Sequence, residues 1–254
     1  MRKQIHDNPI DHGRACSLSH GTWRRVGAKL ACAGASVLMV GQLLLPSVAL
    51  AAEWVNVGGT QYDAGTAAGD EAGTWSWDGA NDMKLNGYDG GSIGAKGNLT
   101  IDVTGINTVT ADARQSAIEV KDGNLAITGE GTLNATAGRW WRKSAVKVEY
   151  GSLAISGDVT LNATAGTDTI AVSGDGKTGG DVDIRGANVN VTAENNVPDT
   201  VGIHTRAGNI TVSEGADVHV EANGLDTAIA VCAENYSSEH GGCIAVDNAK
   251  LNAE

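Results

Sequence analysis

A glycine followed by alternating apolar and polar residues recurs along most of this sequence. Six copies read GNLTI, GNLAI, GSLAI, GDVDI, GNITV and GCIAV, and they are separated by 26, 28, 29, 28 and 34 residues. The copies open at Gly97, Gly123, Gly151, Gly180, Gly208 and Gly242. A regular period of this length is typical of repeat proteins, in which each unit packs against its neighbours.

Each repeat holds three short runs of alternating apolar and polar residues, the pattern of strands with one buried and one exposed face. Aligning the repeats predicts three sets of buried pairs. They are Leu99/Ile101, Leu125/Ile127, Leu153/Ile155, Val182/Ile184, Ile210/Val212 and Ile244/Val246 in the first run; Val109/Ala111, Leu133/Ala135, Leu161/Ala163, Val189/Val191, Val218/Val220 and Leu251/Ala253 in the second; and Ile118/Val120, Val146/Val148, Ile170/Val172, Ile203/Thr205 and Ile229/Val231 in the third.

Three strands in about 28 residues fit one coil of a parallel β-helix, because stacking buries apolar positions that a single coil leaves exposed. We therefore expect an all-β, right-handed parallel β-helix over residues 97–254. An antiparallel sandwich is the competing fold, and it predicts hairpin turns every 8–12 residues. The column-matched repeat favours the solenoid.

Residues 52–96 depart from the repeat and carry three of the six tryptophans. We expect them to form an N-terminal β cap and a first incomplete coil, since an open solenoid end exposes unpaired backbone. Trp54, Trp75, Trp77 and Tyr88 are the residues expected to plug that end. A binding role for these aromatics is the alternative.

The first 51 residues have the features of a secretory signal peptide. A basic leader precedes an apolar run over 30–52 that ends in the small-x-small sequence Ala49-Leu50-Ala51. A membrane anchor is the alternative, because the run is long enough to span a bilayer. Pro46 and the cleavage sequence favour export. We therefore expect a secreted or cell-surface protein without a membrane span in the mature chain.

The charge of the chain bears on its partners. The net charge is −12, and the leader is basic, so the remainder is more acidic still. This balance excludes a nucleic-acid partner, which requires a basic surface. It suits an exported protein that stays soluble or holds divalent cations.

The stretch GTWSWD…MKLNGYDGGSIGAKGNLTIDVTGINTVT, followed by GNLAITGEGTLNATA, resembles the surface repeat proteins of gut Gram-positive bacteria. These carbohydrate-binding domain proteins are similar to pectate-lyase-like parallel β-helices. The resemblance covers the mature chain and implies an extracellular, cell-surface role with binding of acidic polysaccharide. No catalytic motif of that group maps onto residues of this sequence.

The second runs present polar residues at matching outward positions. The predicted outward pairs are Thr110/Asp112, Asn134/Thr136, Asn162/Thr164, Asn190/Thr192, His219/Glu221 and Asn252/Glu254. Asn134, Asn162 and Asn190 therefore form a regular polar face that an extended glycan could bind. The alternative is a solvated face held by Asn–Asn and Thr–Thr hydrogen bonds between coils.

The segment RWWRK follows the second run of its coil and is the sharper candidate for ligand binding. It comprises Arg139, Trp140, Trp141, Arg142 and Lys143. Aromatic faces stack on sugar rings, and cationic side chains pair with uronate carboxylates. The alternative is that one tryptophan folds onto the flank of the coil, the other covers it, and the cations offset local negative charge.

The sequence contains no established metal-binding or catalytic motif. Calcium ligands could come from Asp63, Asp70, Glu71, Asp78, Asp82, Asp89 and Asp175, but the sequence lacks the spacing of known calcium loops and favours solvated acidic loops. Asp183 and Arg185 share one coil without acidic neighbours, and His204, His219 and His240 fall on different strands or loops. We expect no enzyme, and a polysaccharide lyase is the least favoured alternative.

Cys232 and Cys243 flank a loop of ten residues where other coils turn in two. The alignment places Cys232 in the column of Lys121, Glu149 and Arg206, close to the column of Cys243. In an exported protein this arrangement predicts a disulfide. Zinc binding together with His240 is the alternative.

These features predict a non-catalytic cell-surface module that binds polysaccharide or host glycan. A structural stalk or adhesin spacer without a ligand is the alternative. Because the sequence stops within the second run of a coil, at LNAE, we expect a monomer or one part of a longer chain, truncated at its C-terminus.

Overall fold

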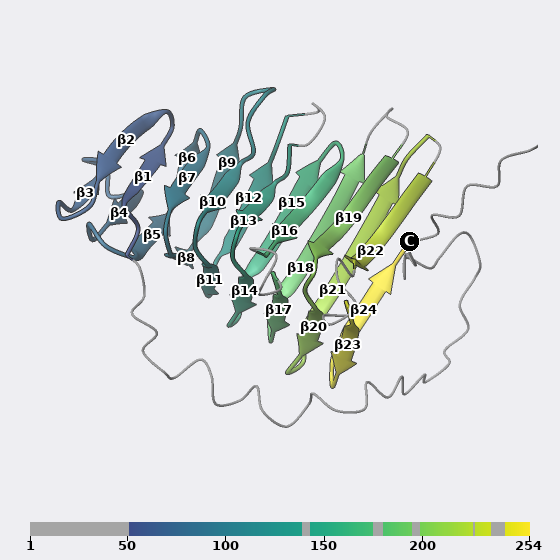
Figure 1. The fold of residues 1–254 in the computed structure, drawn as a ribbon. Coiled ribbons are helices and arrows are strands. Elements are labelled where there is room, and N and C mark those ends of the chain that lie inside the picture. Colours follow the sequence, from purple (N-terminus) through teal and green to yellow (C-terminus); the bar gives the residue numbers. More distant parts are fainter. Residues whose placement is uncertain (1–50, 139–142, 175–179, 195–198, 226, 235–241) are drawn as a thin grey trace, which may run out of the picture.

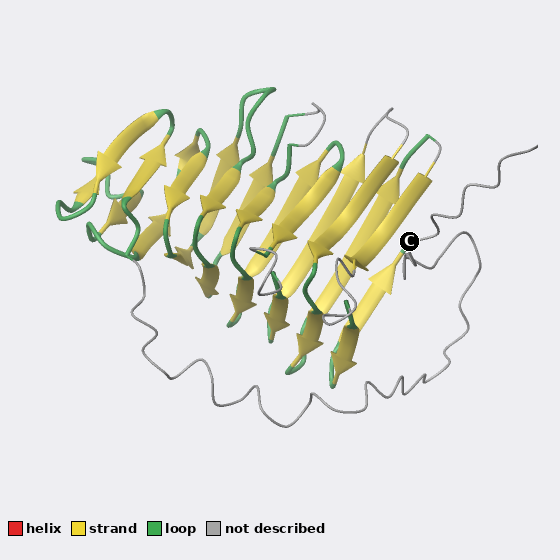
Figure 2. Ribbon diagram, in the orientation of Figure 1, coloured by secondary structure: helices red, strands yellow, loops and turns green. Residues whose placement is uncertain are grey.

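The computed structural model describes residues 51–138, 143–174, 180–194, 199–225, 227–234 and 242–254. These residues form strands and loops and contain no helix (Figure 2). The strands belong to three sheets that run the length of the molecule, with the coils side by side from the N-terminal to the C-terminal end (Figure 1). The prediction of an all-β parallel solenoid is confirmed.

Sheet 1 is built from the first strand of every coil and extends into the N-terminal region. Its order is β23-β20-β17-β14-β11-β8-β5-β4-β3. The strands are β3 (Ala68–Gly69), β4 (Trp75–Trp77), β5 (Asp82–Asn86), β8 (Leu99–Thr104), β11 (Leu125–Gly129), β14 (Leu153–Ser156), β17 (Val182–Arg185), β20 (Ile210–Ser213) and β23 (Ile244–Asp247).

Sheet 2 collects the second strands in the order β24-β21-β18-β15-β12-β9-β6. The strands are β6 (Asp89–Gly90), β9 (Ile106–Thr110), β12 (Thr132–Thr136), β15 (Thr160–Ala165), β18 (Asn188–Glu194), β21 (Asp217–Asn223) and β24 (Lys250–Ala253).

Sheet 3 collects the third strands in the order β2-β1-β7-β10-β13-β16-β19-β22. The strands are β1 (Trp54–Val57), β2 (Thr60–Asp63), β7 (Ile93–Lys96), β10 (Ile118–Lys121), β13 (Val146–Glu149), β16 (Asp168–Ser173), β19 (Asp199–Arg206) and β22 (Thr227–Glu234).

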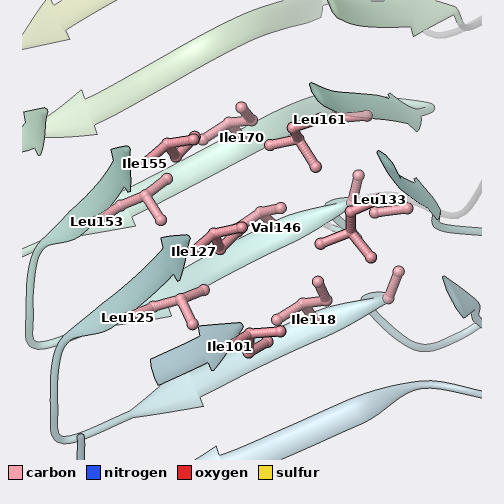
Figure 3. Close-up of a cluster of buried hydrophobic side chains, with 14 of the residues drawn as sticks. Ile101, Ile118, Leu125, Ile127, Leu133, Val146, Leu153, Ile155, Leu161 and Ile170 are labelled. Carbon is pink, nitrogen blue, oxygen red and sulfur yellow. The ribbon is translucent and has the colours of Figure 1, made fainter. Parts of the chain in front are cut away.

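The core consists of columns of identical or similar side chains stacked from coil to coil. Leu125 pairs with Leu99 and Leu153, and Ile127 pairs with Ile101 and Ile155, all in parallel register. These side chains are at most 1% exposed. Figure 3 shows the same stacking for Leu133 beside Leu161 and for Val146 between Ile118 and Ile170. Each coil thus buries the apolar face of the next.

The repeat glycines let successive coils approach closely at the corner before sheet 1. A Cβ on Gly151 would lie 1.9 Å from the carbonyl oxygen of Gly123, and one on Gly208 would lie 2.1 Å from that of Gly180. A side chain therefore cannot be placed there without moving the backbone of the preceding coil, which explains why glycine opens these repeats.

Antiparallel strands close the N-terminal end of the solenoid. Strand β1 pairs antiparallel with β2 and β7, and β4 pairs antiparallel with β3 and β5. Trp75, Trp77 and Tyr88 are buried, whereas Trp54 is only partly covered. The rings of Tyr62 and Trp75 lie 5.3 Å apart. Apolar packing at this end thus covers the first complete coil.

Candidate functional site

The outward face of sheet 2 carries three successive rungs of threonine and asparagine. Strand β12 presents Thr132, Asn134 and Thr136, and these pair in register with Thr160, Asn162 and Thr164 of β15. The next rung, on β18, presents Asn188, Asn190 and Thr192. We call these nine residues the Asn/Thr face. Coils stack at about 4.8 Å and outward residues recur at about 6.6 Å along a strand, so the polar groups form a regular grid.

The central column of this face is a hydrogen-bonded asparagine ladder. The Nδ2 of Asn162 donates to Oδ1 of Asn134, and the Nδ2 of Asn190 donates to Oδ1 of Asn162, both at 2.8 Å. Asn134 and Asn162 are half-buried and Asn190 is exposed. Because each amide nitrogen has two hydrogens and the ladder uses one from Asn162 and one from Asn190, these two side chains each keep one for solvent or a ligand.

Of the segment RWWRK, only Lys143 lies within the described residues. Arg139, Trp140, Trp141 and Arg142 lie outside them. Lys143 is half-buried and lies between β12, which carries the first rung of the Asn/Thr face, and β13. The segment therefore connects the edge of the Asn/Thr face to sheet 3.

The predicted pairing of the first coil is wrong by two residues. Asn134 pairs with Thr108 and Thr136 with Thr110, so Leu133 lies beside Asn107 rather than Val109. Asn107 is fully buried; its Oδ1 accepts from the Tyr88 amide, and its Nδ2 donates to the Thr104 carbonyl, both at 2.9 Å. Its side chain thereby ties the cap to the first coil, a role that alternation alone does not reveal.

A second polar ladder, not predicted from the sequence, runs along the corner after the repeat glycines. The side-chain oxygen of each residue accepts a hydrogen bond from the backbone amide one coil further on. The donor–acceptor pairs are Asn124 to Asn98, Ser152 to Asn124, Asp181 to Ser152, Asn209 to Asp181 and Cys243 to Asn209, at 2.7–3.1 Å. The sequence feature that could have predicted this ladder is the polar residue that follows the glycine in each of the first five repeats.

The outward face of sheet 3 carries alternating charges. Lys147 on β13 donates to Glu119 of β10 at 3.2 Å and also contacts Glu149. Burial disfavours the charged form of Lys147, but its hydrogen bonds and attraction to Glu149 and Glu119 outweigh burial and raise its pKa. This cluster pairs its own charges and leaves no local excess of cations to bind an acidic polymer.

Asp183 and Arg185, the pair considered for catalysis, also bond each other. Arg185 donates to Asp183 on the same strand, and this hydrogen bond raises the pKa of Arg185 despite its partial burial. The flanking residues are Ala154 and Ser156 on one side and Thr211 and Ser213 on the other. His204 and His219 lie on β19 and β21, in different sheets. No nucleophile–base pair forms around Asp183 among the described residues.

The acidic residues of the N-terminal region support loops. Asp70 accepts hydrogen bonds from Thr74 and Trp75; the Thr74 hydroxyl contributes most to lowering the pKa of Asp70. Asp78 accepts from the amides of Ala80 and Asp82. Asp175 lies outside the described residues. Within the described ranges, the acidic residues of this region do not converge at metal-ligand spacing.

The pairing predicted for the fifth coil is also wrong by two residues. Ile203 pairs with Val231 and Thr205 with Ala233, so Cys232 lies beside His204 and Glu234 beside Arg206. Neither Cys232 nor Cys243 is a free thiol in the described part of the chain. That these two sulfurs bond each other stays a prediction, while His240 lies outside the described residues.

Over its described residues, the chain contains no helix of the length and apolar character that a membrane crossing requires. The sequence matches no known protein-family model, no curated protein and no solved structure.

Proposed function

We propose that this chain is an exported cell-surface solenoid that binds an extended acidic polysaccharide or host glycan. The observation that carries the proposal is the Asn/Thr face, whose three in-register rungs repeat along the solenoid axis. A polymer with a regular repeat can make the same contact on each rung. The leftover amide hydrogens and the threonine hydroxyls supply donors and acceptors for sugar hydroxyls.

The RWWRK segment supplies the groups that the flat face lacks. Tryptophan rings stack on sugar rings, and arginine pairs with carboxylates through two parallel hydrogen bonds. In a chain of net charge −12, three cations within five residues form an uncommon concentration of positive charge. An anionic glycan is therefore favoured over a neutral one, and raised ionic strength should weaken its binding.

A structural stalk is the second candidate, and the asparagine ladder favours it. Asn162 uses its oxygen and one amide hydrogen within the ladder, so the face is stabilised without any ligand. Affinity for glycans distinguishes the two functions, because a stalk has none.

Replacing Trp140 and Trp141 together with alanine is expected to weaken glycan binding at least about tenfold, equivalent to about 1.4 kcal/mol. The full chain is screened against acidic and neutral glycans, and the affinity for the strongest binder is then measured by calorimetry. The double variant should keep the thermal stability of the original chain if these rings serve the ligand.

Tyr150→Ala is the matched control, because Tyr150 is a 59% exposed aromatic at the corner between β13 and β14. It should leave affinity unchanged, whereas Asn162→Ala should reduce it if the face contacts the polymer. Equal affinity of the tryptophan variant and the original chain contradicts the assigned site. No affinity for any glycan supports the stalk, and formation of an unsaturated uronate product would reveal a lyase.

A further inference from the structure

Three potential metal ligands meet on the outward side of sheet 3. They are His204 of β19 and Cys232 and Glu234 of β22, and their ligand atoms all lie within 4.8 Å of one another. His204 and Cys232 are neighbours in the parallel register, and Glu234 follows two residues later on the same strand. Within the described ranges, no other group of histidine, cysteine and acidic residues has this spacing.

The imidazole of His204 lies between two carboxylates, one beside each ring nitrogen. Its Nε2 is buried without a hydrogen-bond partner and lies 3.4 Å from the Glu234 carboxylate, while the residue is only 7% exposed. Its Nδ1 lies 3.7 Å from Oδ1 of Asp168 on β16. In metal sites a carboxylate commonly accepts a hydrogen bond from the ring nitrogen that does not bind the metal. Asp168 is the carboxylate on that side of His204.

A buried polar atom without a partner is costly, and a cation would satisfy this one. The flanking carboxylates of Asp168 and Glu234 make the surroundings of His204 favourable for positive charge. The side chain of Glu234 is 30% exposed, so an ion in solvent can reach its carboxylate.

We propose that the chain, when its cysteines are reduced, binds one zinc ion through Cys232 Sγ, His204 Nε2 and the Glu234 carboxylate. Tetrahedral zinc with bonds of about 2.0–2.3 Å separates its ligand atoms by about 3.3–3.8 Å. The Nε2–Oε2 distance of 3.4 Å already falls in this range. A mixed sulfur, nitrogen and oxygen set excludes calcium and magnesium, which take oxygen ligands, and leaves the fourth position for water.

The site depends on the redox state of Cys232. While its sulfur is held in a disulfide, it cannot supply the thiolate that zinc requires. A dithiol reductant transfers two electrons and two protons, the sulfur–sulfur bond breaks, two thiols form, and the reductant becomes a disulfide. Zinc then displaces the proton of the Cys232 thiol. Disulfide and zinc are therefore mutually exclusive states, the first in an oxidising compartment and the second in a reducing one.

The test is a zinc titration of the full chain in which Cys16 and Cys32 are replaced by serine, which removes the thiols of the leader. With a reductant present, we expect one zinc per chain; without it, the affinity should fall at least a hundredfold. Cys243→Ser frees Cys232 from the predicted disulfide, so this variant should bind zinc without a reductant. In that background, His204→Ala and Glu234→Gln should each lower affinity at least tenfold, whereas His219→Ala should not.

Cobalt provides a second readout that needs no ligand variant. Added to the reduced chain, Co²⁺ should give a sulfur-to-metal charge-transfer band that disappears in Cys232→Ser. The proposal is overturned if the reduced chain binds no zinc, if Cys232→Ser binds as well as its parent, or if His204→Ala and His219→Ala have equal affinities.

Discussion

Replacing Gly151 with alanine is expected to lower the free energy of unfolding by about 3 kcal/mol, at the upper end of overpacking effects. The added Cβ would lie 1.9 Å from the carbonyl oxygen of Gly123, which belongs to the backbone of the preceding coil. Backbone cannot rotate away as a side chain can, so the two coils must separate and lengthen their hydrogen bonds. Chemical denaturation followed by circular dichroism measures the change.

Gly94→Ala is the matched control for this substitution. A Cβ at Gly94 would meet its nearest neighbours at 3.7 and 3.8 Å, ordinary van der Waals distances, and the backbone there is not left-handed. Removing a strand glycine restricts the unfolded chain, so this variant should be unchanged or more stable by up to about 1 kcal/mol. Equal losses in both variants would show that the repeat glycines do not mark close contacts between coils.

Ile127→Ala is expected to cost about 2–5 kcal/mol, the range for truncating a fully buried isoleucine. Ile127 is 0% exposed and is stacked between Ile101 and Ile155, so the cavity would interrupt a column of the core (Figure 3). The neighbouring coils are held by backbone hydrogen bonds on both sides and cannot collapse into the space.

The control for Ile127→Ala is Ile106→Ala, since Ile106 is 72% exposed. Its truncation should change stability by no more than about 0.5 kcal/mol. Similar destabilisation by the two variants, measured by the same denaturation experiment, would contradict the inward assignment of Ile127.

The repeat architecture was predictable because two independent signals coincide. Gly123 and Gly151 open repeats at a fixed period, and Leu125/Ile127 and Leu153/Ile155 repeat the same alternation behind them. Both patterns reflect contacts between adjacent coils, because a solenoid makes most of its contacts there. The pairing of the sheet 1 columns was therefore predicted correctly in every repeat. Their burial was predicted wrongly in the last repeat, where Ile244 and Val246 are 36% and 46% exposed.

The pairing register at two points was not predictable for a physical reason. Sliding a strand by one residue exchanges its faces, but sliding it by two keeps every apolar residue inward. Alternation therefore could not distinguish Asn107 from Val109 as the neighbour of Leu133, or His204 from Arg206 as the neighbour of Cys232. Corner lengths and backbone hydrogen bonds decide the register. Because alternation does not report them, the sequence could not predict that the proposed zinc ligands lie side by side.

The candidate glycan site was predictable in one part only. The outward positions of Asn134, Asn162 and Asn190 follow from alternation, and the structure adds that their amides bond one another. The tryptophans of RWWRK belong to no repeated column, so neither alternation nor coil stacking determines their position.

Cross-linking between coils tests the stacked, in-register solenoid most directly. Thr136 and Thr164 are partners in the parallel register of β12 and β15. Adjacent strands lie about 4.8 Å apart, within the range that a disulfide spans. The pair Thr136→Cys/Thr164→Cys, in the Cys16→Ser/Cys32→Ser background, should cross-link under mild oxidation, as detected by non-reducing peptide mass spectrometry.

The displaced pair Thr136→Cys/Thr160→Cys uses the same strands and the same outward face. Its Cα atoms lie about 14 Å apart by strand geometry, well beyond disulfide reach. We predict an efficient cross-link in the first pair and none in the second. Equal cross-linking of the two pairs, or cross-linking of the displaced pair alone, would contradict the stacking on which the Asn/Thr face depends.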